Sequence, residues 1–289
     1  MKRFSPRHGF TLTEVLVVIV AAAILLTLAL PMLLSMRENS RRMTCEYRLT
    51  QIGVAMAEYQ LTNEHYPAGT IDSQSPIQNV AEGFHQNWII ALLADLDQQT
   101  LADQIDPDAS VYAAANAAPR ETPLAIVRCP SDASTSLPTT SNYAGIYASQ
   151  EVPIDEQNDG MLFLNRGVMP EEIDGGLEYT LFVGEKLSDP AEDLGWMSGT
   201  RATIRNVGHP LGDGSHIDSI PTDANGEPNR LWVGGLASRH PGGVNLLLGS
   251  GRVRFYSASG DQEVLQQMAR RSKELAETDD TEIAVETSE

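Results

Sequence analysis

A single carboxylate lies at the edge of the longest apolar segment of the chain. Glu14 follows a short stretch that begins at Phe10, and the 22 residues from Val15 to Met36 carry no charge. A carboxylate in such surroundings is costly to bury and usually has a function, such as pairing with a cation. The alternative is that Glu14 lies at the level of lipid headgroups, where it costs little. The sequence by itself leaves both interpretations open.

The two cysteines, Cys45 and Cys129, offer a second kind of chemistry. They lack the C-x-x-C or Cys/His spacing that is typical of a zinc site. If this part of the chain lies outside the cytoplasm, a disulfide between them can form. It would close a loop of about 84 residues and stabilise the fold by about 3–5 kcal/mol. Two separately buried thiols are the alternative, and we favour the disulfide.

The rest of the sequence carries no strong catalytic or metal-binding pattern. It contains no Gly-x-Ser-x-Gly motif, and its six histidines are dispersed. Two polar clusters lie between residues 209 and 227: His209, Asp213, His216 and Asp218, and the segment 223–227. Asp, Asn and Gly are the usual turn residues, which explains both clusters without a metal. We therefore expect no enzyme activity, no metal site and no cofactor.

Composition and charge narrow the class of protein further. The chain has 289 residues, 42% of them apolar, with 20 basic and 39 acidic residues and a net charge of −19. The length allows one or two compact units. Phosphate binding needs clustered Lys and Arg, so this balance argues against a nucleic-acid partner. Seven acids and no base fall within residues 274–289, which we interpret as a solvated acidic tail.

The charge-free segment predicts a helix that crosses a membrane. At 1.5 Å per residue, 22 residues span about 33 Å, close to the thickness of one hydrocarbon core. A cleaved secretory signal is the alternative, but the segment is longer than a usual signal core and no small-x-small site follows it. Charge does not fix its orientation, because three basic residues precede it and three follow it closely: Lys2, Arg3 and Arg7, then Arg37, Arg41 and Arg42.

The same helix is predicted to continue beyond the membrane. Five residues at steps of four and three form an amphipathic stripe: Cys45, Leu49, Ile52, Met56 and Tyr59. Such a stripe packs on a core, and Asn63 with Pro67 should end the helix. Pro31 removes a backbone donor inside the helix and should kink or loosen it. A helix from Phe10 to Asn63 would be about 80 Å long.

The remaining sequence predicts an α+β head. A second helix is expected within residues 87–105, and a closing helix over 262–275. Short β-like runs lie between turn residues, and short turns favour antiparallel pairing. We expect strands at 124–128, 143–147, 161–164, 179–183, 231–234, 244–248 and 253–256, with a long loop over 208–229.

The start of the chain resembles the cleavage and methylation signal of type IV prepilins and pseudopilins. A basic leader, Gly9, Phe10, Glu14 and the apolar helix that follows carry this resemblance, although Thr13 stands where the family usually has an apolar residue. In that family a prepilin peptidase cuts after the glycine and methylates the new N-terminus. The resemblance implies that Phe10 becomes the methylated first residue and that Glu14 pairs with the Phe10 amine of an adjacent subunit during assembly.

The head is similar to a large family of bacterial prepilin-like proteins whose C-terminal domain has no established function. Several stretches carry the resemblance: Leu49 to Pro67, Asn87 to Gln98, Cys129-Pro130-Ser131-Asp132, Asn142 to Gly145, Asp159-Gly160 and Gly184-Glu185. The family ends in a His-x9-Asp-Gly signature. Here His240 is followed after nine residues by Ser250-Gly251, so the aspartate is missing. The sequence therefore gives little support for a metal or acid role of His240 with position 250. Gly251 still permits a hairpin between two strands.

These inferences give one leading interpretation. The expected parts are a basic leader (1–9), a transmembrane helix (10–36), its continuation on the head (37–66), the α+β head (67–272) and the acidic tail (273–289). The resemblance implies a structural subunit of a type IV pilus or type II secretion system, with its head outside the inner membrane. Its implied partners are prepilin peptidase, membrane lipid and other pilin-like subunits. The alternative is an anchored binding protein that is processed similarly but forms no filament.

Overall fold

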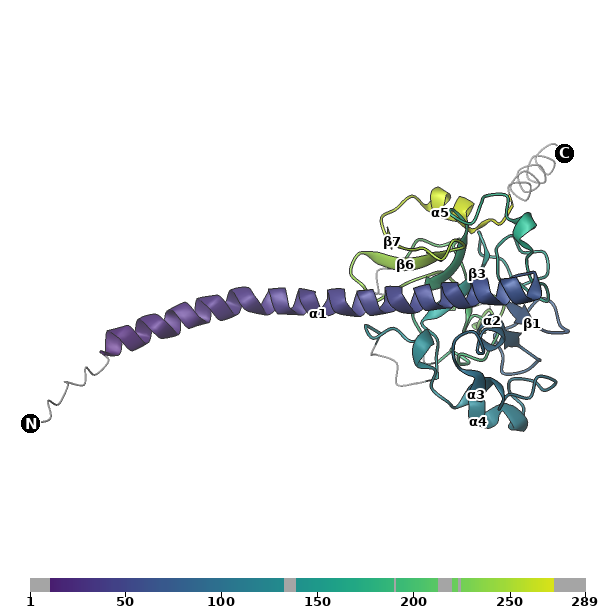
Figure 1. Ribbon diagram of the computed structural model, residues 1–289, viewed down its shortest axis with the longest axis horizontal. Helices are drawn as coiled ribbons and strands as arrows, with labels where there is room; N and C mark the ends of the chain where they lie inside the picture. Colours follow the sequence, from purple (N-terminus) through teal and green to yellow (C-terminus); the bar gives the residue numbers. More distant parts are fainter. Residues whose placement is uncertain (1–10, 133–138, 190, 213–219, 223–224, 273–289) are drawn as a thin grey trace, which may run out of the picture.

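A computed structural model describes residues 11–132, 139–189, 191–212, 220–222 and 225–272 of the chain. One long helix, α1 (Leu12–Asn63), projects from an α+β head (Figure 1). Thr11 caps its start, and Glu64 closes its end in the left-handed conformation with φ 66°. The predicted helix end at Asn63 is therefore confirmed, and so is the α+β class.

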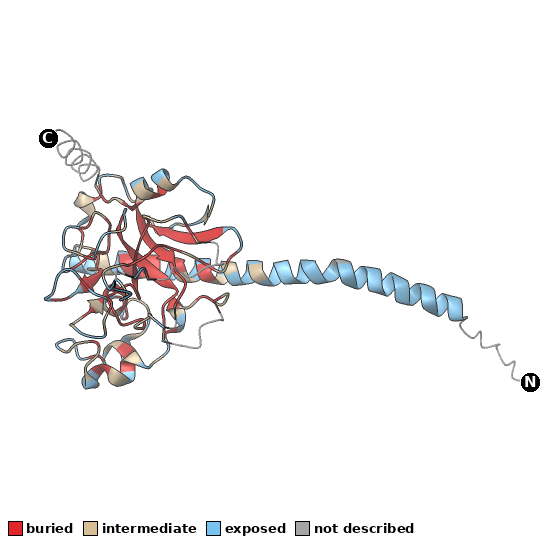
Figure 2. Ribbon diagram, turned by 180° about the vertical axis from the view of Figure 1, so that it is seen from behind, coloured by how far each residue is buried: buried red, intermediate tan, exposed pale blue. Residues whose placement is uncertain are grey.

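The two halves of α1 have different surroundings. In the apolar half (residues 12–36) every side chain that the structure describes is exposed, as the pale blue ribbon in Figure 2 shows. In the head half (residues 37–63), Cys45, Leu49, Ile52 and Met56 are at most 1% exposed, and Tyr59 packs at the edge of the same core. The predicted amphipathic stripe is thus confirmed as the face that packs on the head.

A five-stranded sheet receives this stripe. Its strand order is β5-β3-β4-β6-β7, and the head half of α1 contacts β6 and β7. The strands are β3 (Tyr143–Ala148), β4 (Leu181–Glu185), β5 (Ile204–Asn206), β6 (Gly243–Leu248) and β7 (Val253–Ser257). Four of them pair antiparallel as predicted, whereas the edge strand β5, which was not predicted, runs parallel to β3. A small second sheet pairs β1 (Thr70–Ile71) with β2 (Gln86–Asn87).

The hairpin predicted around Gly251 is present. Strands β6 and β7 are antiparallel partners, and Gly251 has φ +80° in the turn between them. Its N–H donates to the Leu248 carbonyl at 2.9 Å, and the Leu248 N–H donates to the Arg252 carbonyl at the same distance. A side chain at this φ would be strained, which explains the glycine.

The second helix was predicted too long. The structure has two single turns instead, α2 (Trp88–Ala91) and α3 (Gln99–Ala102). Asp97 lies between them with φ +57°, and the Gln98 N–H donates to the Leu93 carbonyl at 2.8 Å, which closes the first turn. The apolar residues that suggested one long helix belong to these short helical turns instead. Their buried side chains still face the core.

Other predicted boundaries were also wrong. Residues 124–128 hold the 3-10 turn η2 (Ala125–Val127) rather than a strand, and residues 161–164 and 231–234 belong to no ladder strand. The closing helix α5 (Gln262–Ala269) stops early because Arg270 is extended and the Arg271 N–H donates to the Asp159 carbonyl. The remaining short elements are η1 (Ala114–Asn116), α4 (Ala117–Arg120) and η3 (Pro170–Glu172).

Candidate functional site

The N-terminal end of α1 carries the predicted assembly residue. Gly9 and Phe10 lie outside the described residues, whereas Glu14 is described and caps its own helix. Its Oε2 accepts hydrogen bonds from the Thr11 N–H at 2.8 Å and the Thr11 hydroxyl at 2.9 Å, and the Thr11 Oγ1 accepts from the Glu14 N–H. This reciprocal capping box fixes the first turn of the helix. Glu14 thus has a local structural role that the sequence interpretation missed.

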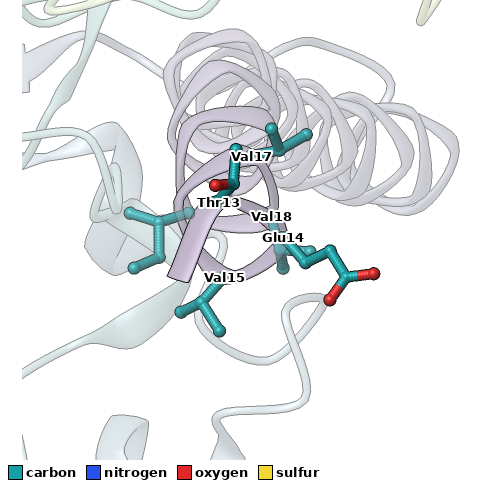
Figure 3. A pocket seen from close by; sticks show the side chains of 6 residues that line it. Thr13, Glu14, Val15, Val17 and Val18 are labelled. Atoms are coloured by element: carbon teal, nitrogen blue, oxygen red, sulfur yellow. The ribbon is translucent and has the colours of Figure 1, made fainter. Parts of the chain in front are cut away.

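The surface around Glu14 is apolar and uncovered. Valine side chains radiate from this end of the helix together with Thr13 and Glu14 (Figure 3). They form an open hollow lined by Thr13, Glu14, Val15, Val17, Val18 and Ile19. The helix is long and apolar enough to cross a membrane, and none of the described residues in its most apolar stretch is buried. Such a surface needs lipid or another apolar helix to cover it.

Pro31 lies within α1, which continues through it without interruption. Figure 1 shows a gentle curve of the projecting part of the helix and no break. The kink or loosening predicted at Pro31 stays a prediction.

A buried polar cluster lies where α1 reaches the head. Cys45 on α1 is joined by a disulfide to Cys129 from the loop after η2, with the two Cα atoms 5.6 Å apart. His240, which is fully buried, lies beside this disulfide with its Nε2 3.4 Å from the Cys129 Sγ. We call these three residues, together with Glu38 and Glu185, the His240 cluster.

Two carboxylates hold the His240 ring. Its Nδ1 lies 2.7 Å from Glu38 Oε1 on α1, and its Nε2 lies 3.2 Å from Glu185 Oε1 at the end of β4. Burial lowers the pKa of His240, but the hydrogen bonds and charges of Glu185 and Glu38 outweigh it, so the pKa is raised above its ordinary value. The His240 ring therefore bridges α1 and the sheet. Glu38 was missed because nothing in the sequence links it to His240.

The polar residues around this cluster are themselves held in place. The Asn142 side chain accepts from the Cys129 N–H at 2.9 Å and donates to Asp132 Oδ2 at 2.6 Å. Ser131 donates to Glu38 Oε1 at 2.8 Å. The sequence landmarks around Cys129, Asn142, Glu185 and His240, which are far apart in the chain, thus meet at one place.

The two ends of the His-x9-Asp-Gly signature, which lacks its aspartate here, lie far from each other. His240 precedes β6 and Ser250-Gly251 follows it, so the six-residue strand separates them by about 20 Å. Position 250 therefore cannot share a ligand or a proton with His240, whichever residue occupies it. The missing aspartate leaves the His240 cluster intact.

Two known families match different parts of the chain. Residues 34–263 match a family described as "Protein of unknown function (DUF1559)", and residues 4–30 match the prokaryotic N-terminal methylation motif. The chain belongs to the DUF1559 family. No curated protein and no solved structure matches it significantly.

The two matches fall on the two candidate regions of this DUF1559 protein. The methylation motif covers Gly9, Phe10, Glu14 and most of the apolar half, and it shows a prepilin-like protein with prepilin-type processing. The DUF1559 match contains the whole His240 cluster. The recognition of a prepilin-like chain with this head domain is confirmed.

The other predicted polar clusters are only partly described. His209 is described, and its Nε2 lies 3.0 Å from Glu151 Oε2. Asp213, His216, Asp218 and residues 223–224 lie outside the described residues.

The head of this DUF1559 protein also has a polar cleft of about 710 Å³. Asn79, 6% exposed, lies in its wall and donates through Nδ2 to the Glu192 carbonyl at 3.1 Å. Among the described residues, its Oδ1 has no hydrogen-bond partner. Further lining residues include Gln74, Gln78, Glu82 and Arg230. No sequence pattern indicates this cleft, because its walls come from segments that are distant in the chain.

Proposed function

We propose that this protein is a type IV pilin-like or pseudopilin-like structural subunit, without enzyme activity, that the apolar half of α1 anchors in the inner membrane. The observation that carries the proposal is the combination of a methylation motif with an apolar helix end that packs on no part of the described head. After cleavage by prepilin peptidase, the same helix surface would contact lipid in the monomer and neighbouring helices in a polymer. The sequence favours neither a pilus nor a type II secretion system.

The position of the head outside the cytoplasm is part of this proposal. A disulfide between Cys45 and Cys129 supports it, because disulfides form and persist in oxidising compartments. The disulfide also joins α1 to the head, so a pull on the helix in a polymer would reach the head through a covalent link.

Assembly would use Glu14 as a charge partner. Cleavage after Gly9 would free the amine of Phe10, a cation that needs a counter-ion in an apolar bundle. The Glu14 carboxylate lies at the same end of the helix, where it is exposed and is held by Thr11 in the capping box (Figure 3). Losing one member of a buried ion pair costs about 3–5 kcal/mol, which is enough to prevent a polymer with repeated contacts.

The structure shows how to separate charge pairing from helix capping. Glu14→Gln removes the charge but keeps a side chain that can complete a capping box, whereas Thr11→Ala removes the capping hydroxyl and keeps the charge. We expect both variants to insert into the membrane and to be cleaved. Sedimentation and microscopy of sheared surface material should show polymer for Thr11→Ala and none for Glu14→Gln. Equal polymer yields from both variants would contradict the pairing role.

The polar cleft supports a second candidate function, an anchored binding protein. The buried Asn79 Oδ1, which has no partner among the described residues, is the specific observation that favours it. If wild type yields no polymer under conditions of native expression, and Glu14→Gln behaves identically, the binding function replaces the structural one.

A further inference from the structure

The His240 cluster contains the donor set of a metal site. One ligand atom each from Cys45, Cys129, Glu185 and His240 lies within 4.8 Å of the other three, and all four residues are buried. Two sulfurs, one imidazole nitrogen and one carboxylate oxygen are ligands that Zn²⁺ takes in tetrahedral sites. Because the four residues come from α1, a loop, the end of β4 and the loop before β6, no sequence spacing could reveal them.

The two distances from His240 Nε2 to its neighbouring ligand atoms fit a tetrahedral ion. At ordinary zinc bond lengths, a nitrogen and a sulfur ligand lie about 3.6 Å apart, and a nitrogen and an oxygen ligand about 3.4 Å apart. His240 Nε2 lies 3.4 Å from Cys129 Sγ and 3.2 Å from Glu185 Oε1. The two sulfurs must separate to about 3.8 Å once the bond between them is broken, and the remaining ligand atoms lie within 4.8 Å of one another.

The surroundings orient the ligands as well. With Nδ1 donating to Glu38 Oε1 at 2.7 Å, His240 would present Nε2 to the ion, which is the usual carboxylate–histidine arrangement behind a metal. Glu185 Oε2 accepts from the Asn245 N–H at 2.7 Å, and Oε1, which faces His240 Nε2, accepts from the Asn245 side-chain amide at 3.2 Å. The Glu38 carboxylate is in turn held by the Ser131 hydroxyl.

We infer that the dithiol form of this chain binds one zinc-class divalent cation through Cys45, Cys129, His240 and Glu185, as the alternative to the disulfide. A dithiol reductant converts the disulfide to two thiols and is itself oxidised to a disulfide. Binding of the cation then releases the two thiol protons, and the Nε2 proton of His240 if that ring is protonated. This inference is independent of filament formation, since the site lies entirely within one chain.

The two states share one mechanical consequence. Cys45 belongs to α1 and the other three ligands belong to the head, so the ion would hold the helix on the head before oxidation, as the disulfide does afterwards. A chain whose cysteines are still reduced would thereby keep its helix–head junction. Loading with metal and oxidation exclude each other, because both use the same two sulfurs.

The test uses the full-length chain in detergent, reduced with a phosphine under anaerobic conditions and then freed of reductant. Zn²⁺ bound per chain is measured by elemental analysis, and Co²⁺ serves as the spectroscopic probe. We expect one Zn²⁺ per reduced chain, tetrahedral cobalt bands with thiolate charge transfer, and no binding by the oxidised chain. His240→Gln should abolish the bands, and Glu38→Gln, which changes only the residue behind the ligand, should weaken binding about 10–100-fold.

His85→Gln is the matched control, because His85 is also a buried histidine near a carboxylate, Asp72, but lies outside the cluster. It should bind Zn²⁺ like wild type. If the reduced chain unfolds without metal, Zn²⁺ should refold wild type and His85→Gln but not His240→Gln. A reduced chain that takes up no Zn²⁺ in either test, or binding that survives in His240→Gln, overturns the inference.

Discussion

The two halves of α1 form one continuous helix but are built for different surroundings. In the apolar half, residues differ little around the helix circumference, and all the described side chains are exposed. In the head half, four residues of one stripe are fully buried while their neighbours Met43, Tyr47 and Val54 remain exposed. The difference teaches that burial within the chain stabilises only the second half, whereas the first depends on contacts outside the chain.

The largest expected difference between the halves concerns the covalent link at Cys45. Replacing both Cys45 and Cys129 by serine should lower the free energy of unfolding of the head by about 4 kcal/mol, because the disulfide closes a loop of 84 residues. Denaturant unfolding of the oxidised protein in the presence of a chelator measures this loss. An unchanged unfolding midpoint would mean that the cross-link does not constrain the head.

Leucine substitutions compare the halves directly. Leu49 is fully buried, so Leu49→Ala should destabilise the head by about 2–5 kcal/mol. Leu25 is 67% exposed, and the matched Leu25→Ala should leave head stability unchanged. Thermal unfolding of both variants in detergent gives the comparison, and equal losses would break the distinction between the halves.

The smallest expected effect is a pH dependence that belongs to the head alone. Burial lowers the pKa of His85, although Asp72 acts in the opposite direction. The folded head then binds fewer protons than the unfolded chain, so stability is complete above the ordinary histidine pKa and falls as the pH drops through it. His85→Gln should lose less stability than wild type between about pH 7.5 and pH 5. A steeper loss in the variant would contradict the assigned direction.

The sequence predicted the local features of the fold well and the long-range ones poorly. The stripe from Cys45 to Met56 and the turn at Gly251 depend on residues close in the chain, and both were placed correctly. The parallel edge strand β5 is only three residues long and includes Arg205 and Asn206, so it has no strand-like pattern. The left-handed Asp97 that interrupts the second helix also carried no clear signal.

The two candidate regions, the helix end at Glu14 and the His240 cluster, also differ in how well the sequence predicts them. A linear motif reports Glu14, because prepilin peptidase and neighbouring helices would meet a continuous stretch of chain. The His240 cluster is assembled from residues that only the folded sheet and helix bring together, and Glu38 lies 202 residues from His240. No spacing rule could join them without the structure.

The most direct test of the central claim is the intact mass of the protein purified from its native membrane, combined with N-terminal sequencing. The account predicts a chain that begins at Phe10 and carries one additional methyl group, so that the apolar half of α1 is retained in the mature protein. Gly9→Val should leave the leader attached, because the altered residue precedes the cut. A native chain that begins at Met1, or anywhere after Ser35, would contradict the account.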